Sequence, residues 1–363
     1  MRFRSAWTTL TTTPMTFPID KFLRPHITKL TPYSSARDEY SGKEGVFLDA
    51  NENPLGSITA EDFNRYPDPY QQSLKQGIAE IKNVPSQRIF LGNGSDEVID
   101  LLFRAFCNPG RDNVIILPPT YGMYGVSAEI NEVAVKKVNL TEDFQMRPDE
   151  ILAAVDAFTK IIFICSPNNP SGNGMNREAV LQVIEGFEGL VVVDEAYIDF
   201  SEDPGFSSQL DQYPNLLVMQ TFSKAWGLAA LRLGMAFAST DIIRVLNRIK
   251  PPYNVSGLTQ STVLSALGQA GKVGDMVKTI LEERDFLEKN LKQISLVRHI
   301  YPSDANFLLV RVPDAGQVYR YLVEKKIIVR DRSKVVLCDG CLRISVGTRS
   351  ENEMLLEALA QYK

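Results

Sequence analysis

Short apolar runs alternate with amphipathic segments along the first two thirds of the chain. The runs that predict strands lie at 113–117, 133–138, 160–165, 190–193 and 216–220. Apolar runs of this length are typical of parallel strands buried on both faces. Helical patterns at 148–158 and 177–187 separate several of them. The alternation predicts an α/β fold with a mainly parallel sheet covered by helices on both faces.

The pattern changes at the two prolines of Lys250-Pro-Pro-Tyr253. The pattern at 256–294 predicts a helical segment that bridges two domains and carries many charged residues at 281–292. The remainder predicts a small α+β domain that closes over the site, with strands near 307–310, 327–330 and 342–346 and helices near 317–324 and 350–361. We therefore expect an N-terminal arm (1–44), a large domain (45–252) and a small C-terminal domain (253–363).

The N-terminal arm has no clear periodicity and contains several prolines, so it is expected to be irregular. Its first 14 residues contain no acidic residue and are rich in threonine and serine. Two interpretations compete: a transit-type presequence, or untranslated sequence that is read only when an upstream start codon is assumed. Either way, we expect these residues to be disordered or to lie on the surface.

Composition narrows the class of protein. The 363 residues carry a net charge of −5, which gives no reason to expect nucleic-acid binding. No apolar run is long enough to span a bilayer. Four cysteines are too few for a disulfide scaffold, so a cytoplasmic location is expected.

Cys338 and Cys341 resemble half of a zinc site, but no second pair accompanies them, so we favour a hairpin turn at Asp339-Gly340 and expect no metal.

The stretch 221–234 contains only two charged residues, Lys224 and Arg232. We expect Lys224 to be desolvated there, because the residues around it are largely apolar. Desolvation lowers the pKa of an ammonium group and makes the neutral amine available as a nucleophile toward carbonyl groups. Lys224 is therefore a candidate Schiff-base lysine.

Polar residues follow the ends of two predicted strands. Asp194 and Tyr197 come directly after the strand at 190–193, and Asn169 follows the strand at 160–165. In open parallel sheets, ligands bind beyond the carboxyl ends of the strands. These side chains and Lys224 are therefore expected at one rim.

A second candidate feature is the glycine loop between a strand near 88–93 and an amphipathic helix that ends near Phe106. The amides of Gly94, Ser95 and Asp96 at a helix N-terminus suit a phosphate group, although such turns are also common for packing alone. Tyr121 follows the strand at 113–117, where its ring either stacks on a cofactor or belongs to the core.

These motifs resemble those of the class I/II aminotransferases, which are fold-type I pyridoxal-phosphate (PLP) enzymes. The resemblance rests on SPNNPSG at 166–172, DEAY at 194–197 and SKAWGLAALRLG at 223–234. Further motifs are similar to histidinol-phosphate aminotransferases: RPH at 24–26, LTPYSSAR at 30–37, NENP at 51–54, YPDP at 66–69 and CLRISVG at 341–347. The resemblance extends from about residue 20 to the C-terminus and implies a mainly parallel seven-stranded sheet with a small α+β domain.

The resemblance implies roles around bound PLP. Asp194 would hold the proton on the ring nitrogen, and Tyr197 with Asn169 would bind the 3′ oxygen. Lys224 would bind the cofactor covalently and carry the proton between the substrate Cα and the cofactor. The phosphate cradle would comprise Gly94, Ser95, Asp96, Ser223 and Arg232, with Tyr121 against the ring. Tyr66 would reach the phosphate of a neighbouring subunit, which implies a homodimer with composite sites.

The resemblance also implies residues that bind substrate: Tyr33, Asn51, Arg330 and Arg343. By itself, Tyr33 is more typical of a half-buried surface aromatic residue than of a ligand-binding one. Arg343 would clamp a carboxylate, because its guanidinium offers paired donors. Arg330 and Tyr33 would bind the substrate's phosphate, which Arg343 would also meet; the alternative for Arg330 is an exposed arginine paired with Asp331 or Glu324.

The implied reaction is transamination between L-histidinol phosphate and 2-oxoglutarate, giving imidazole-acetol phosphate and glutamate in histidine biosynthesis. Two other chemistries on the same scaffold stay open, namely aromatic amino-acid transamination and threonine-phosphate decarboxylation. A non-catalytic PLP-binding regulator of transcription is a further alternative. The short N-terminal arm leaves no room for a DNA-binding domain, and the chain is acidic, so this alternative is disfavoured.

Overall fold

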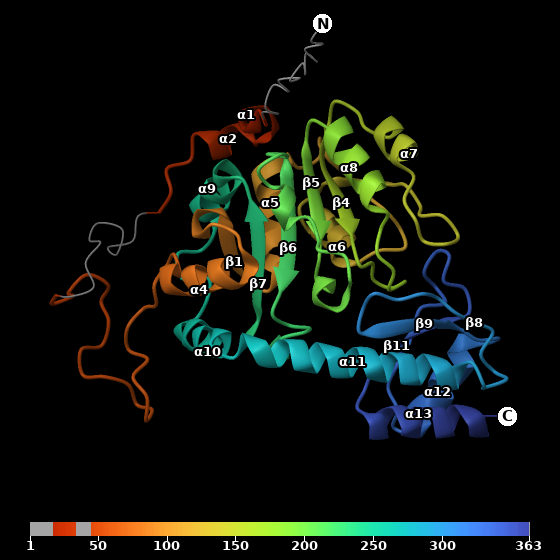
Figure 1. Cartoon of the computed structure of the whole chain (residues 1–363). Coiled ribbons are helices and arrows are strands. Elements are labelled where there is room, and N and C mark those ends of the chain that lie inside the picture. Colours follow the sequence, from red (N-terminus) through yellow and green to blue (C-terminus); the bar gives the residue numbers. More distant parts are fainter. Residues whose placement is uncertain (1–16, 34–44, 363) are drawn as a thin grey trace, which may run out of the picture.

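The computed structural model describes residues 17–33 and 45–362 (Figure 1). The two interpretations of residues 1–14 therefore lie outside the described residues. Within the described part, two short helices, α1 (Ile19–Phe22) and α2 (Pro25–Thr28), precede the main body. No helix in this part is both long and apolar enough to cross a membrane.

A seven-stranded sheet forms the centre of the larger part of the molecule, as the resemblance implied. Its strands are β1 (Ile89–Asn93), β2 (Asn113–Ile116), β3 (Ala134–Lys137), β4 (Thr159–Cys165), β5 (Leu190–Asp194), β6 (Leu216–Thr221) and β7 (Leu233–Ala238). Their spatial order is β1-β7-β6-β5-β4-β2-β3. Strand β7 is antiparallel to both of its neighbours, and the other pairs are parallel. The mainly parallel sheet is thereby confirmed.

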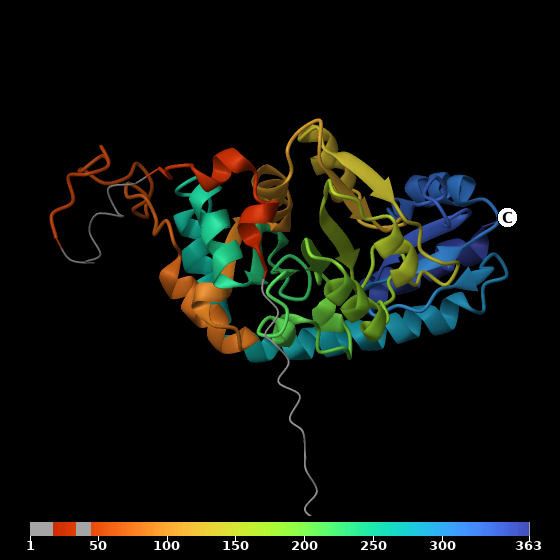
Figure 2. The same cartoon turned by 90° about the horizontal axis from the view of Figure 1, so that it is seen from above.

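Helices cover both faces of this sheet (Figures 1 and 2). One face packs on α5 (Ser95–Phe106), α6 (Met123–Ile130) and α9 (Thr240–Ile249). The other face packs on α4 (Gln72–Lys82), α7 (Pro148–Ala153), α8 (Arg177–Gly186) and α10 (Gly257–Leu267). In β5, Val191 and Val193 join one core while Leu190 and Val192 join the other. This two-sided burial explains why the strands are continuous apolar runs in the sequence.

A second, antiparallel sheet lies near the C-terminus. It comprises β8 (His299–Ile300), β9 (Phe307–Arg311), β10 (Arg330–Asp331) and β11 (Cys341–Ser345), in the order β10-β11-β9-β8. One face packs on α12 (Ala315–Glu324) and α13 (Arg349–Gln361) through side chains that include Leu308 and Leu342. On the opposite face, Phe307 and Cys341 join the core of the large sheet. This sheet therefore presents one face to the larger part of the molecule.

A long helix, α11 (Ala270–Leu291), runs beneath both sheets in Figure 1. It contacts β9 and α13 of the small sheet's layer and also the 3-10 turn Ile198–Phe200, which follows β5 of the large sheet. Other 3-10 turns occur at Ser86–Arg88, Ser207–Gln209 and Ala229–Leu231. The predicted helical stretch 256–294 thus consists of α10 and α11, separated at Gly268.

The structure corrects one predicted strand and confirms a turn. The strand expected at 327–330 is reduced to Arg330–Asp331, because Lys326 has a positive φ of 63° and Ile327 donates its N–H to the Leu322 carbonyl, ending α12. The turn at Asp339-Gly340 is present directly before β11, with φ of 67° at Gly340.

Candidate active site

A cavity of about 160 Å³ opens where β4, β5 and β6 end, at the rim predicted from the sequence. Residues from five separate segments line it: Ser95, Asp96, Tyr121, Cys165, Asn169, Asp194, Ala196, Tyr197, Thr221, Ser223, Lys224, Ala229 and Arg232. Strand order explains this convergence, since β4, β5 and β6 are parallel neighbours and deliver their carboxyl ends side by side. The structure therefore brings together most of the residues that the motifs singled out.

Asp194 is the buried acid of this cavity, and a tyrosine that the sequence analysis missed holds it in place. The Tyr124 hydroxyl donates to Asp194 Oδ2 at 2.6 Å, and the Ala196 N–H donates to Oδ1 at 3.1 Å. Burial raises the pKa of Asp194 to about 6, although both hydrogen bonds oppose the rise. Tyr124 lies on α6, just after Tyr121, and no motif in the sequence marked it.

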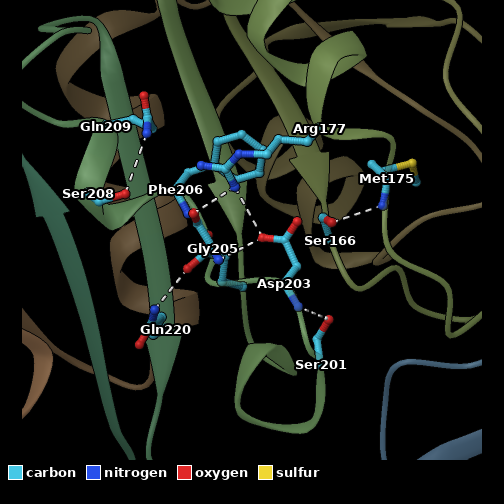
Figure 3. Close-up of polar contacts among 11 residues, drawn as sticks. Ser166, Met175, Arg177, Ser201, Asp203, Gly205, Phe206, Ser208, Gln209 and Gln220 are labelled. Carbon is cyan, nitrogen blue, oxygen red and sulfur yellow. Dashed lines mark hydrogen bonds and ion pairs between the residues drawn. The ribbon is translucent and has the colours of Figure 1, made fainter.

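The neighbouring carboxyl group, Glu195, faces away from the cavity. It accepts hydrogen bonds from the Phe206 N–H at 2.6 Å and from Gln220 Nε2 at 2.8 Å. Arg177 fastens the loop that carries Phe206, because its guanidinium donates to Asp203 and to the Gly205 carbonyl (Figure 3). Burial raises the pKa of Glu195 to about 7. Glu195 therefore holds the loop that carries Phe206 in place, whereas Asp194 faces the cavity.

Lys224 projects into the cavity from the turn after β6. Its neighbours Phe222, Ala225 and Trp226 are buried, while Lys224 itself is reached by solvent through the cavity, so the predicted desolvation is only partial. The walls still enclose its ammonium group, and this partial burial, followed by the charges of Arg343 and Arg232, lowers the pKa of Lys224. A lysine amine with a lowered pKa next to a buried carboxyl group is a reactive arrangement.

The N-terminus of α5 lies at the cavity, where the anion cradle is predicted. The helix begins at Ser95 with Gly94 as its N-cap, so no capping side chain competes for the first N–H groups. Strand β7 lies directly against this turn, since a Cβ at Gly234 would come within 2.2 Å of the Ser95 nitrogen. Arg232 adds a cation, and its Nη2 lies 3.6 Å from an Asp96 oxygen. Backbone donors and a guanidinium thus converge on one end of the cavity.

Tyr197 and Asn169 link the cavity to the small sheet. Asn169 Nδ2 donates to the Tyr197 hydroxyl at 3.3 Å, and Arg343 on β11 donates to Asn169 Oδ1. The Arg343 guanidinium also lies over the Phe307 ring, with its carbon 5.3 Å from the ring centre. Burial raises the pKa of Tyr197, so its hydroxyl keeps its proton as a donor. Arg343 is therefore the point where the small sheet reaches the cavity.

Six predicted residues are not among those that line this cavity. Gly94 and Arg343 contact residues that do, whereas Arg330, Tyr33, Asn51 and Tyr66 lie elsewhere in the single chain. Tyr33 lies beside Tyr70 and Lys250 and is 75% exposed. Asn51 and Tyr66 line another hollow, where the Tyr66 ring stacks on Tyr253 at 4.5 Å.

Arg330 lies at the edge of the small sheet and is exposed. Among the described residues it has no ion pair with Asp331 or Glu324, the partners considered in the alternative interpretation. Asp331 instead accepts hydrogen bonds from the N–H and hydroxyl of Ser333. Sequence reasoning did not single out Arg332, although it follows Arg330 by two residues.

Comparisons with known proteins agree with this geometry. The family model of aminotransferase class I and II matches residues 43–359. A histidinol-phosphate aminotransferase of Cytophaga hutchinsonii is 57% identical over 96% of this chain and 100% of its own length. The crystal structure of the histidinol-phosphate aminotransferase from Clostridium acetobutylicum has a TM-score of 0.76 at 23% identity, over 82% of this chain and 90% of that one. The crystal structure of the histidinol-phosphate aminotransferase from Sinorhizobium meliloti, in complex with pyridoxal 5′-phosphate, has a TM-score of 0.75 at 22% identity, over 86% of this chain and 89% of that one. The two solved structures share the fold of this chain.

Proposed function

The chain belongs to the class I and II aminotransferases, within the histidinol-phosphate aminotransferase family, and on this premise we propose its reaction. It transfers the amino group of L-histidinol phosphate to 2-oxoglutarate, giving imidazole-acetol phosphate and L-glutamate. The observation that carries this proposal is the 57% identity to a curated relative over nearly the whole of both chains. The alternatives, aromatic amino-acid transamination and threonine-phosphate decarboxylation, are not favoured.

Pyridoxal 5′-phosphate is the cofactor, and the residues of the cavity fit it. A buried carboxyl group with a pKa of about 6 suits a cationic ring nitrogen, and the uncapped first turn of α5 beside Arg232 suits a phosphate. When bound, the protonated ring withdraws electrons from the carbon that loses a proton. We assign Asp194 to the ring nitrogen, Tyr197 and Asn169 to the 3′ oxygen, and Tyr121 to the ring face.

The phosphate of the cofactor is assigned to the cradle at the start of α5. The amides of Gly94, Ser95 and Asp96 supply hydrogen-bond donors, and Ser223 and Arg232 supply side chains from the opposite wall. The Thr221 hydroxyl donates to Ser223 Oγ at 3.0 Å and so orients it. These contacts hold the cofactor in one orientation relative to Asp194 and Lys224.

Lys224 is assigned two tasks: it binds the resting cofactor covalently, and its amine moves the proton of the substrate Cα. The lowered pKa supports the second task, because a larger share of the amine is then unprotonated at neutral pH. Arg343 holds the carboxylate of glutamate, and its bond to Asn169 couples substrate binding to the wall of the cofactor site.

Arg330 is proposed to bind the phosphate of histidinol phosphate, and its replacement by alanine is a direct test. The loss of a charged phosphate partner should lower kcat/KM for histidinol phosphate by about 30-fold or more. The loss for unphosphorylated histidinol should be small. Steady-state kinetics with both donors measure the difference, and equal losses on the two would show that Arg330 does not bind the phosphate.

We further propose that the enzyme is a homodimer with composite active sites. Large apolar side chains are almost fully exposed on the segment that precedes Tyr66: Val46 at 89%, Leu48 at 88%, Leu55 at 93% and Ile58 at 106%. This segment extends away from the body of the molecule in both views (Figures 1 and 2). Monomeric proteins rarely expose such a patch. A second copy would cover it and would let Tyr66, and Asn51 beside it, approach the partner's cavity.

The dimer proposal predicts a dependence on protein concentration. Dilution below the dimer dissociation constant should reduce specific activity and cofactor retention together, because Tyr66 then leaves the phosphate site. Analytical ultracentrifugation and activity over the same dilution series measure both quantities. The Leu55→Asp variant should shift the loss to higher concentration. Full activity of a monomeric species would contradict composite sites.

A panel of donors tests the proposed reaction. We expect amino transfer to 2-oxoglutarate with histidinol phosphate to exceed that with phenylalanine or tyrosine, and we expect no carbon dioxide from threonine phosphate. A preference for the aromatic amino acids, or release of carbon dioxide, would support one of the two alternatives instead.

We place the enzyme in the cytoplasm, since its four cysteines are free and buried, as a reducing compartment permits.

A further inference from the structure

Three arginines share one face of the small sheet. Arg330 lies directly opposite Arg343 in the register of β10 and β11. The pairing continues one step beyond β10, because the Arg332 N–H donates to the Cys341 carbonyl at 2.8 Å. Residues opposite each other, and residues two apart on one strand, project to the same side of a sheet. Arg330, Arg332 and Arg343 therefore project to the side where Cys341 and Phe307 meet the large sheet.

This arrangement of cations has no ion-pair partner in the described part of the chain. None of the three arginines forms an ion pair there with a carboxylate, and Asp331 is engaged by Ser333. Like charges placed opposite each other in a sheet destabilise it. An anion bound between the arginines would remove this cost.

Arg332 in particular has an unused donor. Its Nε is buried and has no hydrogen-bond partner among the described residues. Buried N–H groups without a partner are rare in folded proteins and indicate a missing ligand or water. The charges of the three arginines also interact. Burial is the largest cause of the lowered pKa of Arg332 and of Arg343; the charge of Arg330 lowers the pKa of Arg332 further, and the charge of Arg332 lowers that of Arg343. Arg332 is therefore part of the same electrostatic site as Arg343.

Resting on the proposed function, we propose that Arg332 is a specificity-determining residue that binds the phosphate of histidinol phosphate together with Arg330 and Arg343. The two substrates explain why a further arginine is needed. A carboxylate carries one charge and is matched by one guanidinium fork. A phosphate monoester has a net charge of about −1.5 to −2 and three acceptor oxygens, so it can bind more than one guanidinium group. Arg343 matches one carboxylate of glutamate, whose second carboxylate also carries a single charge, and Arg332 contributes when the anion is a phosphate.

The Arg332→Met variant tests this proposal, because methionine keeps an apolar stem and removes the charge. We expect kcat/KM for histidinol phosphate to fall by about 10- to 100-fold, the range for a lost hydrogen bond to a charged group. The values for glutamate and for unphosphorylated histidinol should change by less than about 3-fold. Inorganic phosphate should also become a weaker competitive inhibitor. The Arg332→Lys variant, which restores the charge without the fork, should recover part of the loss.

Lys334→Met is the matched control, since Lys334 is an exposed cation in the same turn and should leave every substrate unaffected. Equal losses on all substrates in Arg332→Met would reduce Arg332 to a structural role, and an unchanged preference for the phosphorylated donor would overturn the proposal outright. Should Arg332→Met not fold, Arg332→Lys decides alone, because an undiminished preference there would overturn it as well. A wild-type enzyme that does not prefer histidinol phosphate to histidinol would instead refute the proposed function, and this proposal with it.

Discussion

Replacing Lys224 with alanine should lower the rate of both half-reactions by about 10⁴-fold or more while the protein stays folded. The variant removes the amine that projects into the cavity beside Asp194 and Tyr197, and Lys224 Nζ lies 5.7 Å from the centre of the Tyr197 ring. The cradle at α5 is untouched, so the variant should still bind the cofactor, but only reversibly. Single-turnover measurements with glutamate report the rate of the chemical step.

A second lysine provides the control for this assignment. Burial lowers the pKa of Lys75, to about 8, so Lys75 is also a candidate nucleophile on chemical grounds. It lies on α4 and does not line the cavity. Borohydride reduction of the wild-type holoenzyme, followed by peptide mapping, should place the cofactor on Lys224. The Lys75→Met variant should also be labelled on Lys224. Labelling of Lys75 would contradict the site described here.

Replacing Asp194 with asparagine should reduce kcat by about 10²- to 10³-fold with the cofactor still bound. Asparagine has the same shape, and it can keep the contacts with Tyr124 and the Ala196 N–H, but it carries no charge to hold a proton on the ring nitrogen. Glu195→Gln is the matched control, because this adjacent carboxyl group faces Gln220 and Phe206 instead of the cavity. Near-normal turnover in Asp194→Asn, or an equal loss in Glu195→Gln, would contradict the assignment.

The same variant has an expected effect on stability in the cofactor-free protein. The folded pKa of Asp194 is about 6, above the value of 3.8 for the free side chain, so the folded state binds the proton more tightly. Asp194 therefore destabilises the fold progressively as pH rises from about 4 to 6, by roughly 2 to 3 kcal/mol once it is ionised. Urea unfolding should show Asp194→Asn to be more stable than wild type at pH 8 by about this amount, with little gain at pH 4. An equal difference at both pH values would show that ionisation is not the cause.

Much of the large sheet could be predicted because its strands are buried on both faces. The strands β4, β5 and β6 are runs of apolar residues that end in polar motifs, so both their position and the rim they form were predicted from the sequence. Strand β7 was not predicted, because its residues overlap a motif that was interpreted for its chemistry. Its antiparallel pairing with β6 and β1, and the tight contact of Gly234 with Ser95, join segments that no local pattern relates.

The site shows the same division between local and long-range information. Lys224, Asp194 and Asn169 follow strands and carry recognisable motifs, whereas Tyr124 reaches Asp194 from 70 residues away. Arg332 escaped notice because its significance depends on a strand register that places Arg330 opposite Arg343. Tyr33, Asn51 and Tyr66 were assigned from resemblance, and a single chain does not bring them to the cavity. Contacts between distant segments, or between two copies of the chain, leave no periodic signal in the sequence.

The most direct test of the central claim is amino transfer from glutamate to imidazole-acetol phosphate by the purified enzyme with pyridoxal 5′-phosphate. Cofactor absorbance, 2-oxoglutarate and histidinol phosphate are followed in one reaction. The account predicts that the two products appear in a 1:1 ratio, that the absorbance changes of the two half-reactions match their formation, and that Lys224→Ala abolishes both. Formation of 2-oxoglutarate without histidinol phosphate, while an aromatic keto acid is aminated readily, would contradict it.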